Sequence, residues 1–210
     1  MSRAWLGLLA LVLYGCQRPA PEWPGDLTAQ AGLCSAVQVL RLQQRDSPTP
    51  PASFDGFLRI LHIAMIAGAR QGGRVDLRTL DDVSRRASVA LQELREQDWE
   101  ARVPNCAAAF PEARRNAGAL PQAPFDAGMT CFGLADFIGR TASDFPAESL
   151  AAAELAERAL AASAPELTRQ ARTNQQAEQL ADRYRVQAFL AGTPSSVLDQ
   201  CAQRFPGRSG

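Results

Sequence analysis

The chain contains no lysine and only one histidine, His62, among its 210 residues. A single histidine excludes catalytic and metal sites that need two, such as the zinc-binding pattern with two histidines one helical turn apart. All 22 basic side chains are arginines, and 22 acidic side chains balance them, so the formal net charge is zero. Because affinity for nucleic acid requires a concentrated basic field, we expect no nucleic-acid partner.

Strand patterns and membrane-spanning runs are also scarce. We find no convincing alternation of β-branched or aromatic residues with polar ones, the pattern that predicts strands. The N-terminal apolar run covers residues 4–13, about half of the roughly twenty residues that cross a bilayer. It follows a positive charge at Arg3 and ends near the small residue Gly15, as is typical of a secretory signal.

The end of this run, Leu13-Tyr14-Gly15-Cys16, resembles the lipobox of bacterial lipoproteins. In a lipobox a leucine lies three positions before the cysteine, and a small residue lies directly before it. Tyr14 occupies a position where a small or β-branched residue is usual. The resemblance implies that residues 1–15 are a signal peptide that is removed. It also implies that Cys16 becomes an acylated N-terminus carrying diacylglycerol and an amide-linked chain such as palmitate.

Such an anchor would hold the protein to a membrane, since each buried methylene contributes about 0.8 kcal/mol. Gln17, rather than aspartate, follows the cysteine. By the sorting rule of enteric lipoproteins, this implies the outer membrane, facing the periplasm. Residues 16–26 contain three prolines and are expected to form an extended tether. A plain secretory signal cleaved near Gly15 and an uncleaved anchor are the alternatives, and all three export the mature chain.

Four cysteines remain after Cys16, namely Cys34, Cys106, Cys131 and Cys201. An even number in an oxidising compartment predicts two disulfides. No two of them have the spacing of a CxxC motif, which argues against a thioredoxin-like redox site and against most thiolate zinc sites. We therefore expect neither a metal nor another cofactor.

Two of these cysteines begin the same motif, Cys-Ala-x-x-Phe-Pro, at residues 106–111 and 201–206. Each follows another cysteine at nearly equal distance, 72 positions from Cys34 to Cys106 and 70 from Cys131 to Cys201. We interpret this as an ancient tandem repeat, with chance similarity of Ala-rich helices as the alternative. The repeat favours the pairs Cys34–Cys106 and Cys131–Cys201, each closing a loop worth about 4 kcal/mol in the chain-entropy model. The rival pairings link the halves, and free thiols on a metal are a third alternative.

Helical patterns recur along the chain, and we predict an all-α fold of two tandem disulfide-closed helical-bundle units of about four helices each. The units cover residues 27–111 and 125–206, and residues 112–124 form the linker. In an up-and-down bundle the start of the first helix and the end of the fourth lie at the same end, which brings each cysteine pair together. Because neither unit is large, we expect them to share an interface.

In the first unit we expect a helix over residues 27–42 and a second one that is apolar nearly all round. The second is capped by Ser53 or Asp55 and ended by Gly72-Gly73. Asp76 is expected to cap a third helix. A short fourth helix is expected from about Pro104 to Pro111. The third helix carries a predicted apolar stripe of Leu77, Leu80, Val83, Ala87, Leu91 and Leu94.

The second unit repeats this plan. Asp126 is expected to cap its first helix, and Pro146 to open an Ala-rich helix that lasts until about Ala162. A kink or restart is expected at residues 163–166, because they contain a proline. A long helix over residues 174–190 and a last one after Thr193 complete the unit.

His62 is the first candidate for chemistry. Asp55, Arg59 and His62 share one edge of their helix, because they are four and three residues apart. One interpretation is a polar notch with His62 as acid or base. The other is a boundary stripe with His62 hydrogen-bonded and inert. We favour the second, because no serine or cysteine nucleophile stands in a recognisable motif and Ala159 is the equivalent of His62 in the second unit. We predict no catalytic residue and no metal site.

These observations together predict an exported, membrane-tethered lipoprotein that acts as a non-catalytic binding or adaptor protein, with a protein as its partner. The plan is similar to that of small, helical, disulfide-stapled periplasmic proteins such as secretion-system immunity proteins and acid-stress chaperones. A carrier of lipid or another apolar ligand, with its cavity lined by Leu58, Leu61, Met65 and the stripe from Leu80 to Leu94, is the first alternative. An enzyme using His62 is the second. The arginine pairs at 85–86 and 114–115 are interpreted as surface charge, with contact to anionic headgroups as the alternative.

Overall fold

The computed structural model describes residues 22–46, 53–116, 118–171 and 173–207, so the predicted signal peptide and Cys16 lie outside the described residues. Within these ranges the chain is helical and contains no strand, which confirms the predicted all-α fold. The α-helices are α1 (Leu27–Asp46), α2 (Phe54–Gly72), α3 (Leu77–Leu94), α4 (Val103–Ala109), α5 (Pro124–Thr141), α6 (Pro146–Gln170), α7 (Asn174–Ala191) and α8 (Pro194–Arg204). Two short 3-10 helices, η1 (Glu100–Arg102) and η2 (Pro111–Arg114), flank α4. None of the described helices is long and apolar enough to span a membrane.

The ends of α2 and α3 follow their capping residues. Ser53, rather than Asp55, caps α2, and its hydroxyl accepts a hydrogen bond from the Gly56 N–H at 3.1 Å. After α2 the chain turns at Gly73, whose φ of 62° is a left-handed conformation that glycine adopts without strain. Asp76 caps α3 as predicted, because its Oδ1 accepts from the Thr79 N–H at 2.9 Å. The helix boundaries in the first half therefore have local causes.

Three predicted details are wrong, and two of them concern single residues. Asp126 does not cap α5, because the helix begins earlier, with Pro124 in its first turn, where a missing N–H costs nothing. Asp126 instead accepts a hydrogen bond from the Tyr184 hydroxyl of α7. Leu77 does not belong to the buried stripe of α3, since it is 60% exposed at the first residue of the helix.

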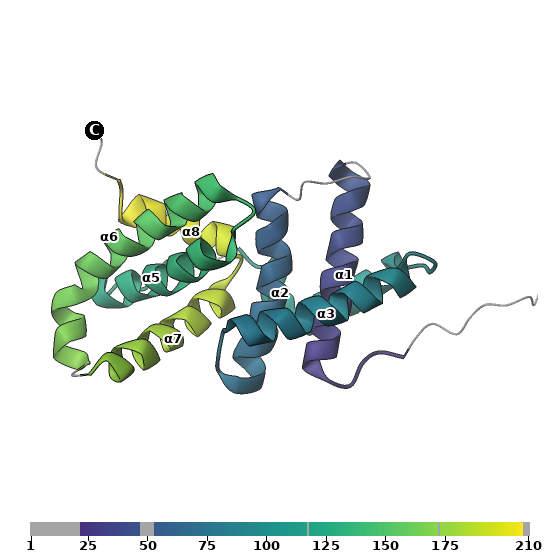
Figure 1. The fold of residues 1–210 in the computed structure, drawn as a ribbon, viewed down its shortest axis with the longest axis horizontal. Helices are drawn as coiled ribbons and strands as arrows, with labels where there is room; N and C mark the ends of the chain where they lie inside the picture. Colours follow the sequence, from purple (N-terminus) through teal and green to yellow (C-terminus); the bar gives the residue numbers. More distant parts are fainter. Residues whose placement is uncertain (1–21, 47–52, 117, 172, 208–210) are drawn as a thin grey trace, which may run out of the picture.

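The third difference concerns the length of α6. This helix does not end near Ala162 but continues through Pro165 to Gln170. Its C-terminal part bends away from the rest of the helix in Figure 1. A proline inside a helix removes one backbone hydrogen bond and bends the axis. The kink was thus predicted correctly and the end of the helix was not.

Both predicted disulfides are present. Cys34–Cys106 joins α1 to α4 with a Cα–Cα distance of 5.4 Å, and Cys131–Cys201 joins α5 to α8 with a distance of 5.5 Å. Each bridge therefore closes one half of the chain. No described cysteine pairs with the other half.

The repeated motif also has the same backbone geometry in both halves. Phe110 has φ −128° and ψ 65°, and Phe205 has φ −124° and ψ 67°. The N–H of each phenylalanine donates to the carbonyl of the motif cysteine, at 3.0 Å in the first half and 2.8 Å in the second. The two halves therefore end in the same local structure.

The halves pack on each other through α2. This helix contacts α1 and α3 in its own half and α7 and α8 in the other, and Figure 1 shows it standing between the two groups of helices. One hydrophobic cluster includes Leu58, Leu61 and Met65 of α2 together with Ile138 and Phe189 of the second half. The expected interface is thus a continuous core, and it explains why α2 is apolar nearly all round.

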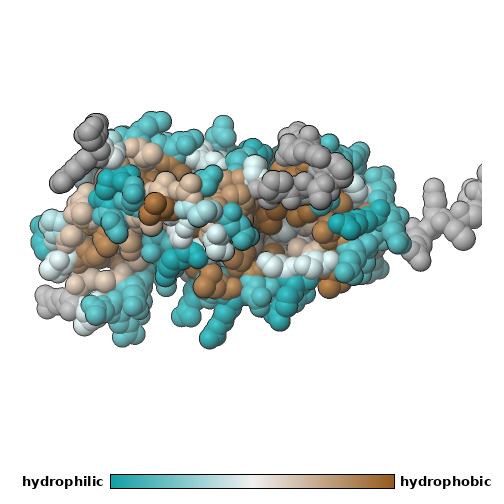
Figure 2. All heavy atoms as spheres, turned by 45° about the horizontal axis from the view of Figure 1, so that its top comes forward, coloured by the Kyte–Doolittle hydropathy of each residue, from teal (hydrophilic) through white to brown (hydrophobic). Residues whose placement is uncertain are grey.

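Apolar side chains reach the surface in scattered places. The large exposed ones are Leu77, Val89 and Leu150. On the face shown in Figure 2, hydrophobic residues form small areas separated by hydrophilic ones. Isolated exposed hydrophobic residues are common on protein surfaces, so the concave regions are the better candidates for a binding site.

Candidate functional site

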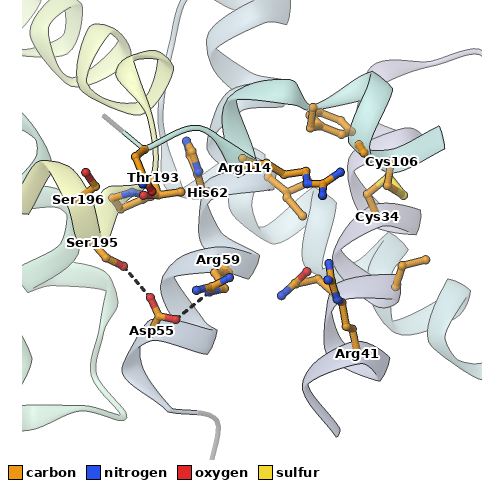
Figure 3. Close-up of a pocket in the computed structure, with 18 of the residues that line it drawn as sticks. Cys34, Arg41, Asp55, Arg59, His62, Cys106, Arg114, Thr193, Ser195 and Ser196 are labelled. Atoms are coloured by element: carbon orange, nitrogen blue, oxygen red, sulfur yellow. Dashed lines mark hydrogen bonds and ion pairs between the residues drawn. A yellow bond between two sulfur atoms is a disulfide. The ribbon is translucent and has the colours of Figure 1, made fainter. Parts of the chain in front are cut away.

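The three residues of the predicted polar notch lie in the wall of one pocket. Arg59 Nε donates to Asp55 Oδ2 at 2.7 Å, one turn apart on α2. The other oxygen, Asp55 Oδ1, accepts from the Ser195 hydroxyl of α8 at 2.8 Å; Figure 3 shows both contacts. Partial burial acts to raise the pKa of Asp55, but the hydrogen bonds from Arg59 and Ser195 outweigh it and keep that pKa below its ordinary value. The charged carboxylate therefore ties α2 to α8.

His62, the third residue of the notch, has no surface exposed to solvent. Its Nε2–H donates to the Phe189 carbonyl of α7 at 2.6 Å, and its Nδ1 has no hydrogen-bond partner among the described residues. Burial lowers the pKa of His62 to about 4, although the Phe189 carbonyl and the Glu112 carboxylate act in the opposite direction. The imidazole is therefore neutral at pH 7 and holds α2 against α7.

The pocket has a volume of about 640 Å³ and lies where the two halves meet. This size is within the usual range of ligand sites. The first half contributes α1, α2, α4 and η2, and the second contributes Thr193 and the first two turns of α8. The Cys34–Cys106 disulfide forms part of the wall. Figure 3 shows this bridge at one end of the pocket and Thr193, Ser195 and Ser196 at the other.

Two arginines in this pocket have no carboxylate partner among the described residues. They are Arg41 of α1 and Arg114 of η2, and in Figure 3 both side chains extend into the region beside the disulfide. Arg59 also lines the pocket but is paired with Asp55. Asp199 of α8 is the second acidic residue of the lining. The pocket therefore has an excess of positive charge, concentrated on the side of α1 and η2.

The segment that carries Arg114 is held from several directions. The Glu112 carboxylate accepts a hydrogen bond from Arg70 of α2 at 2.5 Å, and Arg70 also donates to the Ala109 carbonyl at 2.6 Å. The Thr193 N–H donates to the Arg115 carbonyl at 2.9 Å. Partial burial acts to raise the pKa of Glu112, but Arg70 outweighs it and keeps that pKa below its ordinary value. Because Glu112 faces Arg70, Arg114 remains available to the pocket.

The sequence pattern predicts the wall of the pocket formed by α2, but it does not predict the wall that contains the two arginines. The spacing of Asp55, Arg59 and His62 predicted the α2 side. Arg41 was not singled out, and Arg114 was interpreted as surface charge. A signal existed, because Arg41 lies seven residues after Cys34 and Arg114 eight residues after Cys106. The predicted disulfide therefore brings both arginines toward the same place.

An apolar groove of about 390 Å³ lies between α1 and α3. Leu33, Val89 and Leu94 contribute to its lining, and Val89 is 59% exposed. The helices approach closely here because of Gly32, where a Cβ atom would lie 2.5 Å from the Cβ of Arg86. This groove is the second concave region that a ligand could use.

Neither metal ligands nor known relatives indicate a more specific chemistry. Among the residues that the structure describes, no three His, Cys, Asp or Glu side chains form a group that could hold a metal ion. Comparisons with protein-family models, with curated proteins and with solved structures found no match.

Proposed function

We propose that this chain is an exported, membrane-tethered binding protein of the cell envelope, which acts without catalysis and whose partner is another protein. Acylated Cys16 is its anchor, in an outer membrane with the folded part facing the periplasm. The pocket at the junction of the halves is its binding site. The resemblance of residues 13–16 to a lipobox supports the anchor, and the pocket geometry supports the binding role.

The observation that carries this proposal is a polar pocket whose walls are joined to one another by covalent and hydrogen bonds. Its walls are connected by the Cys34–Cys106 bridge, by the Asp55–Ser195 hydrogen bond and by the contact of Thr193 with the Arg115 carbonyl. Rigid walls reduce the ordering cost of binding. A pocket of about 640 Å³ has room for several residues of an extended polypeptide. These features favour recognition of a protein segment.

The state of His62 supports a non-catalytic role. A general acid or base must reach the substrate proton and have a pKa near the working pH. The ring of His62 has no exposed surface, its Nε2 is engaged by a backbone carbonyl, and its pKa is lowered to about 4. These properties suit a residue that joins two helices.

A carrier of an apolar ligand is the second candidate. Leu58, Leu61 and Met65 do not favour it, because they are packed in the core with 1% exposure or less. The other part of the expected lining, on α3, favours it, since Val89, Ala90 and Leu94 line the groove between α1 and α3, whose exposed surface is mostly apolar. Lipid that copurifies with the protein, and that is displaced by Val89→Arg, would favour this candidate.

Site-specific photo-crosslinking in the native envelope tests the proposed function. A photoreactive phenylalanine analogue replaces Ala107, a small residue of the pocket wall, and in a matched variant it replaces Ala161, which is exposed on α6. We expect a defined protein adduct at position 107 and none at 161, on protein whose Cys16 peptide has the mass of an acylated N-terminus. Equal adducts at both positions, or none, would contradict the proposal.

A further inference from the structure

The three arginines that line the pocket differ in whether a carboxylate neutralises them. Arg59 is neutralised by Asp55 at 2.7 Å, whereas Arg41 and Arg114 have no carboxylate partner among the described residues. Two guanidinium groups that line one concave site repel each other. Such an arrangement is favourable when an anion lies between them.

The backbone around each of these arginines is fixed before any ligand arrives. Arg41 lies on α1, two helical turns after the bridged Cys34. Arg114 lies on η2, which is held by the Arg70–Glu112 pair and by the bond from Thr193 to the Arg115 carbonyl. Because the bridge joins α1 to α4 directly before η2, the two arginines keep their relative position.

The rest of the lining indicates which anion fits. Asp199 of α8 also faces the pocket, so a compact dianion such as phosphate would meet a like charge. An extended peptide can place its carboxylates at the arginines and its neutral groups near Asp199. Gln38 and Asn116, which line the same pocket, carry amides that can both donate to and accept from a peptide backbone.

We propose that the pocket binds an acidic peptide segment, with side-chain carboxylates clamped between Arg41 and Arg114. This inference rests on the proposed function and gives the chemistry of its partner. Arginine suits this role because its planar guanidinium makes paired hydrogen bonds to a carboxylate. The N-terminal turn of α8, residues 194–196, faces the same pocket and adds partial positive charge.

Fluorescence anisotropy with a rhodamine-labelled peptide of six glutamates tests the clamp. We expect saturable binding by the mature protein and none with the matching peptide of six glutamines. Arg41→Gln and Arg114→Gln should each weaken binding at least tenfold, with unchanged circular dichroism. The matched control is Arg78→Gln, which removes the same charge from an exposed residue of α3 outside this pocket. Asp199→Asn should strengthen binding, because it removes the opposing charge.

Three outcomes would overturn the clamp. The first is equal binding of the glutamine peptide, and the second is an equal loss in Arg78→Gln, which would indicate diffuse attraction. The third is binding of dihexanoyl phosphatidic acid, but not of the glutamate peptide, in an Arg114-dependent way, which would assign the pocket to a lipid headgroup.

The clamp and the proposed function fail in different experiments. A protein adduct at position 107 that persists in Arg114→Gln, without glutamate-peptide binding, would leave a binding protein and remove the clamp. Arg114-dependent binding of the glutamate peptide, without any protein adduct in the envelope, would support the clamp and contradict a protein partner.

Discussion

At the scale of single residues, His62 shows how burial determines the role of an ionisable group. Its pKa is lowered to about 4 because the ring is removed from water, and the hydrogen bond to Phe189 only partly offsets this. The unfolded chain, in contrast, has the ordinary histidine value of 6.5. Between these two values the unfolded state binds a proton that the folded state does not. His62 should therefore make the fold sensitive to mild acid.

We predict that the free energy of unfolding falls by about 2 kcal/mol between pH 7.5 and pH 5 because of His62 alone. Urea unfolding at several pH values measures it. His62→Gln is the matched variant, because its amide can donate to the Phe189 carbonyl but does not titrate. The carboxyl groups with lowered pKa, Asp55, Asp76 and Glu112, lose their stabilising charge mainly below this window. A wild-type slope that persists in His62→Gln would show that another group is responsible.

At the scale of helices, close packing in the second half depends on small residues of α5. A Cβ atom at Gly128 would lie 2.0 Å from Ser163 Oγ and 3.1 Å from the Ala159 carbonyl, both on α6. Ser163 is buried, and its hydroxyl donates to that same carbonyl at 2.9 Å. A change of its side-chain rotamer would therefore break this hydrogen bond. The glycine therefore sets the distance between α5 and α6.

Gly128→Ala is expected to lower the free energy of unfolding by about 2 kcal/mol, since overpacking a tight helix contact forces side chains or backbone to shift. Gly72→Ala is the control. It lies in the last turn of α2, and a Cβ atom there would have no neighbour within 4 Å. Alanine should be neutral or slightly stabilising at that position. Thermal unfolding of both variants measures the difference, and equal stabilities would contradict the packing argument.

At the scale of the whole molecule, the continuous core makes the two halves one cooperative unit. We predict that removing the bridge of the second half, with Cys131→Ala and Cys201→Ala, destabilises the first half as well, by up to about 4 kcal/mol. Trp99 packs against the cluster of α1 and α3 residues in the first half, and Trp23 lies shortly before α1, so their fluorescence in urea reports on the first half. Their transition should shift together with the circular dichroism of the whole chain. A tryptophan transition that stays at the wild-type midpoint would mean that the halves unfold separately.

The parts of this fold that were predictable are those with local causes. The Ser53 and Asp76 caps act on N–H groups three residues away. The disulfide pairing followed from a motif that occurs twice. The side of the pocket formed by Arg114 was not predictable in this way. It depends on Arg70 and Glu112, which are 42 residues apart in the sequence and meet only after α2 and η2 have packed. The periodic pattern of apolar residues in a sequence does not predict a contact of this kind.

The same reason explains why the junction of the halves was expected only in general terms. Burial on all sides of α2 could be predicted from its apolar residues, but its partners could not. The bond from His62 to Phe189 spans 127 residues, and the bond from Ser195 to Asp55 spans 140. Both depend on the placement of complete helices.

The disulfide pattern has a consequence for biogenesis. The four bridged cysteines pair in the order in which they occur, the first with the second and the third with the fourth. A polypeptide threaded across a membrane from its N-terminus presents Cys34 and Cys106 to an oxidase before Cys201 has emerged. The proposed acylation of Cys16 would remove this fifth thiol from disulfide exchange. If the chain is exported as proposed, joining successive thiols as they arrive gives the native bonds directly, so an oxidant without a disulfide isomerase is expected to suffice for its maturation.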